Sequence, residues 1–130
     1  TIGLREGLLW GIAGFVAFQL APAMGLEPEL PGTMAADLDA RQLWWWGTAF
    51  ATAGGLALIG YGKGVPAYGA AILLLALPHI IGAPELEGYT GVAPPELAAA
   101  FAARGLGVGL AVWATLGALT GHLWSRSATD

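Results

Sequence analysis

Polar residues divide the chain into four long apolar stretches. These apolar stretches cover approximately residues 8–24, 43–61, 65–81 and 97–124. A helix needs about 20 apolar residues to cross the hydrocarbon core of a bilayer, so each stretch can form one transmembrane helix. The third stretch is the shortest, and its Pro66 and Pro78 predict a kink or an irregular end. The pattern predicts an all-α integral membrane bundle of four transmembrane helices, forming a single domain over residues 1–130.

The second and fourth helices are expected to extend beyond the bilayer. Thr33 has the character of an N-cap and Asp37 follows near the helix start, which predicts a second helix over residues 34–61. The Pro-Pro-Glu run at 94–96 favours the start of a helix that continues to residue 124. At 1.5 Å per residue each helix would be about 40 Å long, against a core of about 30 Å. Their outer ends are therefore expected to protrude.

Composition agrees with a membrane protein. Hydrophobic residues make up 56% of the chain and charged residues only 11%, whereas soluble domains carry about 25% charged residues. The absence of cysteine excludes disulfides, thiolate metal sites and cysteine nucleophiles. The sequence contains no basic cluster, which argues against nucleic acid as a partner. It also contains no Walker, HExxH, nucleophile-elbow or CxxCH motif, so nothing in it indicates an enzyme.

Charge predicts the orientation. Arg5, Lys63 and Arg126 fall on one face of a bundle with four crossings. The opposite face receives the loops 25–42 and 82–96, which carry seven carboxylates: Glu27, Glu29, Asp37, Asp39, Glu85, Glu87 and Glu96. By the positive-inside rule the basic face is cytoplasmic. The sequence therefore predicts a multi-pass protein of the inner (cytoplasmic) membrane with both termini in the cytoplasm and acidic periplasmic or extracellular loops.

The acidic face is a candidate cation site. Carboxylates concentrate divalent cations through their field, and imidazole is a ligand for borderline transition metals such as cobalt. His79 lies at the outer end of the third stretch, shortly before Glu85 and Glu87. The alternative interpretation is that the acids are solvated loop residues and that His79 is a hydrogen-bonding residue of the membrane interface.

Arg104 is a charge within the fourth apolar stretch. A charge at such a position usually has a partner, and Glu96, Asp37 and Asp39 are the candidates. The alternative is that the Arg104 side chain extends to the membrane interface without pairing.

Glycine spacing predicts close helix packing. Gly3, Gly7 and Gly11 recur at four-residue intervals, and so do Gly117 and Gly121. Small residues at this spacing let helix backbones approach closely in membranes, within one chain or between subunits.

Three consecutive tryptophans, Trp44, Trp45 and Trp46, begin the second apolar stretch. Consecutive residues point in different directions around a helix, which is typical of an interfacial aromatic belt. A contact with a pigment or quinone is the alternative.

The chain resembles the CbtA family of predicted cobalt transporter subunits. The resemblance rests on the series PELPG, ARQLWW and PHIIGAP, with the flanking segments REGLLWGIAGFVAFQLAPAMGLE and PPELAAAFAARGLGVGL, and runs from Arg5 to Trp124. Members of this family are typically longer, with further membrane helices before the matched region, so the resemblance implies that this chain is either a short relative or corresponds to the second half of a longer protein. The family motifs fall on the following positions: Glu29, Pro31, Arg41, Gln42, Trp44, Trp45, Pro78, His79 and Pro84.

The resemblance implies a membrane subunit of a cobalt uptake system that feeds cobalamin synthesis. His79 is then expected to handle the metal, with Glu27, Glu29 and Glu85 attracting it, while Arg41 anchors its loop to a carboxylate. Cobalt or a similar divalent cation would be transported, and no cofactor is expected to be tightly bound. The expected partners are membrane lipid and other membrane subunits, such as a small CbtB-like subunit. The alternative is a structural or accessory subunit of a larger membrane complex, with no transport of its own.

Overall fold

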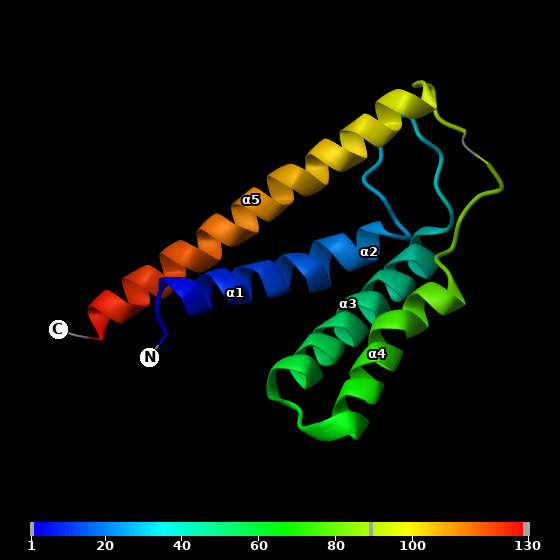
Figure 1. Cartoon of the computed structure of the whole chain (residues 1–130). Coiled ribbons are helices and arrows are strands. Elements are labelled where there is room, and N and C mark those ends of the chain that lie inside the picture. The colour runs from blue at the N-terminus through cyan, green and yellow to red at the C-terminus, as the bar shows by residue number, and fades with distance from the viewer. Residues whose placement is uncertain (1, 89, 129–130) are drawn as a thin grey trace.

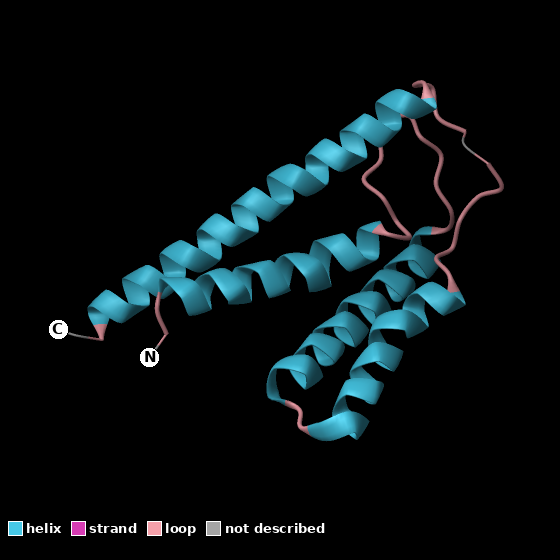
Figure 2. Cartoon of the chain, in the orientation of Figure 1, coloured by secondary structure: helices cyan, strands magenta, loops and turns pink. Residues whose placement is uncertain are grey.

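The computed structural model describes residues 2–88 and 90–128 of the 130-residue chain. Every regular element within these residues is a helix, which confirms the all-α fold class (Figure 1, Figure 2). In chain order the elements are α1 (Leu4–Phe15), η1 (Val16–Leu20), α2 (Ala21–Ala23), α3 (Leu38–Tyr61), α4 (Gly64–Ile81) and α5 (Pro95–Ser127). α1, η1 and α2 follow one another without a break, so the described chain forms four helices.

The first helix contains a π-helical turn at η1, which the hydropathy pattern does not predict. The N–H of Ala21 donates to the carbonyl of Val16, five residues earlier, instead of to that of Ala17. Pro22 follows directly and has no N–H to return the chain to the α-helical pattern at that point. The second half of this helix therefore contains a local defect in the backbone hydrogen bonding.

The start of α3 differs from the sequence prediction. The helix begins at Leu38 instead of residue 34, so residues 34–37 belong to the preceding loop. Its N-cap is Asp37, whose carboxylate accepts a hydrogen bond of 3.0 Å from the N–H of Ala40. The N–H of Thr33 instead donates to the carbonyl of Leu30 at 3.2 Å, in a turn of the loop. The prediction of Thr33 as the N-cap was wrong, because Asp37 is equally suited to the role and stands next to the helical residues.

α3 and α4 form an antiparallel helical hairpin joined by Gly62 and Lys63 (Figure 1). α4 contains both predicted prolines, Pro66 near its start and Pro78 in its last turns. It ends at Gly82, whose φ of 85° is readily adopted by a residue without a Cβ.

The four helices form two packed pairs. α1 packs along α5, and α3 packs along α4, while η1 and α2 join the pairs through contacts with α3. Figure 1 shows the termini and the α3–α4 turn at one end of the molecule and the two long loops at the other. This arrangement has Arg5, Lys63 and Arg126 on the side of the termini and the acidic loops on the opposite side.

Three helices of the described residues are long and apolar enough to cross a membrane: Leu4–Ala23, Gly64–Ile81 and Pro95–Ser127. α3 has 24 residues but is less apolar, because it begins with charged residues and three tryptophans and continues with glycines and threonines. A membrane crossing by α3 therefore stays a prediction. α5 has 33 residues, which corresponds to a length of about 50 Å. That α3 and α5 protrude from the bilayer also stays a prediction.

Candidate functional site

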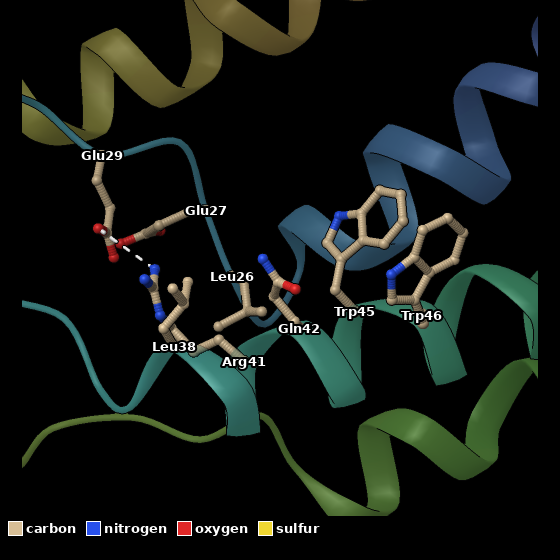
Figure 3. A pocket seen from close by; sticks show the side chains of 8 residues that line it. All are labelled: Leu26, Glu27, Glu29, Leu38, Arg41, Gln42, Trp45 and Trp46. Carbon is tan, nitrogen blue, oxygen red and sulfur yellow. Dashed lines mark ion pairs between the residues drawn. The ribbon is translucent and has the colours of Figure 1, made fainter.

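A hollow lies beside the long loops, at the end of the bundle opposite the termini, and we call it the outer cavity. It consists of two adjoining parts that share Leu26, Glu27, Glu29 and Arg41 in their walls. The first part has a volume of about 600 Å³ and is closed on its other side by Gln42, Trp45 and Trp46 of α3 (Figure 3). The cavity therefore combines charged groups from a loop with amide and indole groups from a helix.

Arg41 organises the first part of the outer cavity. Its guanidinium lies 3.9 Å from the carboxylate of Glu29, and the two side chains are 27% and 37% exposed. Figure 3 shows Glu27 beside this pair, extending from the same loop toward Arg41. The Nε of Arg41 is buried and has no hydrogen-bond partner among the described residues. The ion pair connects the loop after α2 to the first turn of α3.

The second part of the outer cavity brings further metal-binding groups together. It has a volume of about 350 Å³, and Glu85 lines it together with Glu27 and Glu29. Met24 and Met34 also line it and offer thioether sulfurs. Three of the four residues predicted to handle metal therefore share one cavity, although no three His, Asp or Glu residues of the described chain form a group that could hold a metal ion.

His79 does not line the outer cavity. It lies near the end of α4, where its exposed ring meets the ring of Trp44 edge-on at a centroid distance of 6.0 Å. Trp44 also donates a hydrogen bond of 3.1 Å from its Nε1 to the carbonyl of Pro78. His79 is thus positioned by the α3–α4 contact, and it is not among the residues that line the outer cavity with Glu27, Glu29 and Glu85. Its role as a metal ligand stays a prediction.

Arg104 has no ion pair with another described residue, and its side chain is exposed. Asp37 serves as the N-cap of α3, and Asp39 lies exposed in the first turn of that helix. The arrangement is that of an arginine extended toward the helix surface rather than of a buried pair with Asp37, Asp39 or Glu96.

The glycines of α1 and α5 face one another. A Cβ added to Gly7 would collide with the backbone of Gly117 and lie 2.8 Å from the Cα of Gly121. A Cβ added to Gly117 would likewise collide with the carbonyl of Gly7 and lie 2.8 Å from the Cα of Gly11. A Cβ on Gly121 would collide with the carbonyl of Gly3. The two glycine series therefore interlock within the chain and let the two backbones touch.

The three tryptophans point to three different neighbours. Trp44 contacts α4, and Trp45 lies 6.3 Å from the ring of Phe18 in η1. Trp46 is exposed and stacks on Phe50 of the same helix at 5.5 Å. Two of the three therefore join helices, and Trp46 is the one that faces outward.

Three polar residues that are not among the predicted site residues occupy interior positions. Gln19 of η1 donates a hydrogen bond of 3.4 Å to the carbonyl of Gly105 in α5, and its amide group lies against Gly109. Thr48 and Thr52 of α3 are fully buried. The signal that points to the threonines is their four-residue spacing within an apolar stretch, which places both on one helix face.

Comparison with known proteins gives one match. The family model described as "Probable cobalt transporter subunit (CbtA)" matches residues 1–125 of the chain. No curated protein and no solved structure matches it. The match covers nearly the full length and includes every helix up to Ser125 of α5. The chain therefore belongs to the CbtA family of probable cobalt transporter subunits.

Proposed function

We propose that this chain is a membrane subunit of a system that takes up cobalt, or a similar divalent cation, for cobalamin synthesis. In this proposal the outer cavity faces the periplasm or the extracellular space, and both termini lie in the cytoplasm. α3 is the fourth membrane-spanning helix, and the outer ends of α3 and α5 stand above the hydrocarbon core.

The observation that carries the proposal is the convergence of Glu27, Glu29 and Glu85 on the outer cavity. Three carboxylates around one hollow create a negative potential that raises the local concentration of divalent cations. Arg41 offsets only one of these charges through its ion pair with Glu29. The cavity is therefore suited to collect cations, and His79 on α4, outside the cavity lining, is the group suited to select a borderline metal.

The membrane potential is a sufficient energy source. A divalent cation that moves inward across 100 mV gains about 4.6 kcal/mol, from about 2.3 kcal/mol per charge. The sequence has no Walker motif, so in this proposal either the potential or a partner subunit drives uptake.

The proposal is tested by uptake of radioactive cobalt into cells that express the chain with its natural membrane partners. Glu85→Gln is the test variant, and Glu87→Gln is its matched control. Both remove one carboxylate from the same loop, but only Glu85 lines the outer cavity. We expect Glu85→Gln to lower uptake at limiting cobalt several-fold and Glu87→Gln to leave it close to normal. Combined replacement of Glu27, Glu29 and Glu85 is expected to lower it at least tenfold.

Equal effects of Glu85→Gln and Glu87→Gln would contradict a role for the cavity, because only general surface charge would then matter. Uptake that stays normal in the triple variant would remove the three carboxylates from the mechanism.

A second function, that of a non-transporting accessory subunit, is favoured by the exposed apolar surface of α5. Only Ala102 and Gly121 of its 33 residues are buried, while side chains such as Val108, Val112 and Leu119 are exposed. This surface suits lipid or other membrane subunits, including a small CbtB-like one. Cobalt uptake that requires the chain but survives loss of all three cavity carboxylates and of His79 would favour this function.

A further inference from the structure

Thr48 and Thr52 are the fully buried polar side chains of the described structure, with 0% and 1% of their surface exposed. Neither Oγ1 has a hydrogen-bond partner among the described residues. Burying a hydroxyl without a partner costs free energy, and this cost is greatest where no water can replace the partner. Two such hydroxyls one helical turn apart indicate that something outside the chain's own atoms satisfies them.

The two threonines lie where three segments meet. Trp44 and Gly55 contact α4, whereas Trp45 contacts η1. Thr48 follows Trp44 by four residues and Trp45 by three, so it points between these two neighbours. Thr52 continues the same stripe one turn further along. Both hydroxyls are therefore directed to the junction of α3 with α4 and η1.

A backbone carbonyl of α4 lacks its helical donor at a residue whose side chain faces α3. Pro78 has no N–H, so the carbonyl of Leu74, four residues earlier, lacks its helical partner. At one end of the α3–α4 contact, Trp44 donates a hydrogen bond to the carbonyl of Pro78. At the other end, Gly55 lies against Leu75 and Ala71. Because α3 and α4 are antiparallel, Leu74 lies between these two contacts, and a Cβ on Gly54, two residues after Thr52, would lie 3.5 Å from its Cδ1.

The π turn leaves a second carbonyl without a donor. The N–H of Ala21 donates to the carbonyl of Val16. In this pattern the carbonyl of Ala17 would next accept from the N–H of residue 22, but residue 22 is a proline and has no N–H. Ala17 is 2% exposed, and the neighbouring Phe18 contacts Trp45. The Ala17 carbonyl therefore also lies at the height of the first half of α3.

From this juxtaposition we propose that the Oγ1 atoms of Thr48 and Thr52 and the carbonyl oxygens of Ala17 and Leu74 form a binding site for a dehydrated sodium ion. All four are neutral oxygens, the ligands that suit a hard cation. α3 contains no carboxylate or imidazole after Asp39. Neutral oxygens alone stabilise a monovalent cation far better than a divalent one. Broken helices near the bilayer midplane supply such carbonyls to sodium ions in transporters, and Thr48 and Thr52 lie at the centre of α3.

The sodium site is separate from the outer cavity and does not depend on cobalt uptake. It gives the chain a second cation whose binding ties α3 to α4 and to the π turn of the first helix. A ligand that binds only the folded chain raises its stability with concentration. Sodium is therefore expected to stabilise the packing of the two helix pairs against each other.

The test is thermal unfolding of the detergent-purified chain in sodium chloride, compared with choline chloride at the same ionic strength and with no cobalt present. We expect a saturable rise in Tm with sodium. Thr48→Val and Thr52→Val keep the side-chain shape and are each expected to move the sodium midpoint at least tenfold higher. The double variant is expected to lose the response. Thr115→Val, an exposed position on α5, is the control and should respond like the unaltered chain.

Equilibrium binding of radioactive sodium to the same samples gives a second readout that does not depend on unfolding. The proposal is overturned if the unaltered chain has the same Tm in both salts and binds no sodium. It is equally overturned if the double valine variant keeps the sodium response. Because cobalt is absent throughout, either failure concerns the sodium site alone and leaves the proposed uptake function untouched.

Discussion

The indole Nε1 of Trp44 donates a hydrogen bond of 3.1 Å to the carbonyl of Pro78, across the contact between α3 and α4. The same indole ring meets the imidazole of His79 edge-on. One side chain therefore joins the outer ends of the two helices and orients the neighbouring histidine. The carbonyl of Pro78 also accepts the N–H of Gly82 at 3.0 Å, so this bond lies at the point where α4 ends.

Trp44→Phe is expected to lower the free energy of unfolding by at least about 1 kcal/mol, because the smaller phenyl ring cannot make the hydrogen bond to Pro78. Unfolding of the purified protein in mixed detergent micelles measures this change. Trp46→Phe is the matched control: Trp46 is exposed and stacks only on residues of its own helix. A loss of stability as large in Trp46→Phe as in Trp44→Phe would show that the Pro78 bond is not responsible.

Gly117→Ala is expected to destabilise the chain by about 1–3 kcal/mol, since the added methyl group would collide with the backbone of α1. Gly107→Ala in the same helix has open space around the new methyl group and should be neutral or stabilising by about 1 kcal/mol or less. The two variants make the same substitution in the same helix, but Gly117 faces the backbone of α1 whereas Gly107 faces open space. Comparable stability of both would contradict the interlocking of α1 with α5.

Gln19→Leu is expected to weaken the contact between η1 and α5. It removes the hydrogen bond to the Gly105 carbonyl, and such bonds contribute about 0.6 kcal/mol on average in membrane proteins. Cross-linking between cysteines introduced into η1 and α5 measures the separation of the two segments. A cross-linking rate unchanged from that of the parent chain would show that the bond does not hold them together.

His79→Ala is expected to weaken cobalt binding at least tenfold, or about 1.4 kcal/mol, if the imidazole is a ligand as proposed. Calorimetry on the detergent-purified protein provides the measurement. His122→Ala, which removes the other histidine of the chain, is the control. Binding that is absent or indifferent to His79→Ala would remove this residue from the mechanism.

The ion pair of Arg41 with Glu29 is expected to contribute little stability. A separation of 3.9 Å between partly exposed groups predicts a coupling of about 0.2–1 kcal/mol. A double-mutant cycle with Arg41→Gln and Glu29→Gln measures this coupling through unfolding. A coupling of several kcal/mol would instead indicate that the pair is shielded from water by a partner or by lipid headgroups.

Some of the candidate site could be predicted from local sequence, and some could not. Glu27 and Glu29 lie two residues apart, so their shared cavity wall follows from their shared loop. His79 and Glu85 are also close in sequence, yet only Glu85 lines the cavity. His79 belongs to α4, which ends at Ile81, and its imidazole meets the ring of Trp44, whereas Glu85 belongs to the loop that follows. Proximity in sequence predicts proximity in space only where no helix end intervenes.

By itself the sequence determined the helical class, the approximate position of each helix and the spacing of the glycines, because these depend on the local transfer of side chains and backbone into an apolar medium. Only the tertiary structure decided that α1 pairs with α5, about a hundred residues away, and that Asp37 rather than Thr33 begins α3. It also decided that Thr48 and Thr52 are fully buried and that their hydroxyls have no hydrogen-bond partner among the described residues. Lipid is as apolar as the helices it surrounds, so hydropathy cannot select partners. Close fitting of small residues and interhelical hydrogen bonds, such as that from Trp44 to the Pro78 carbonyl, make that selection.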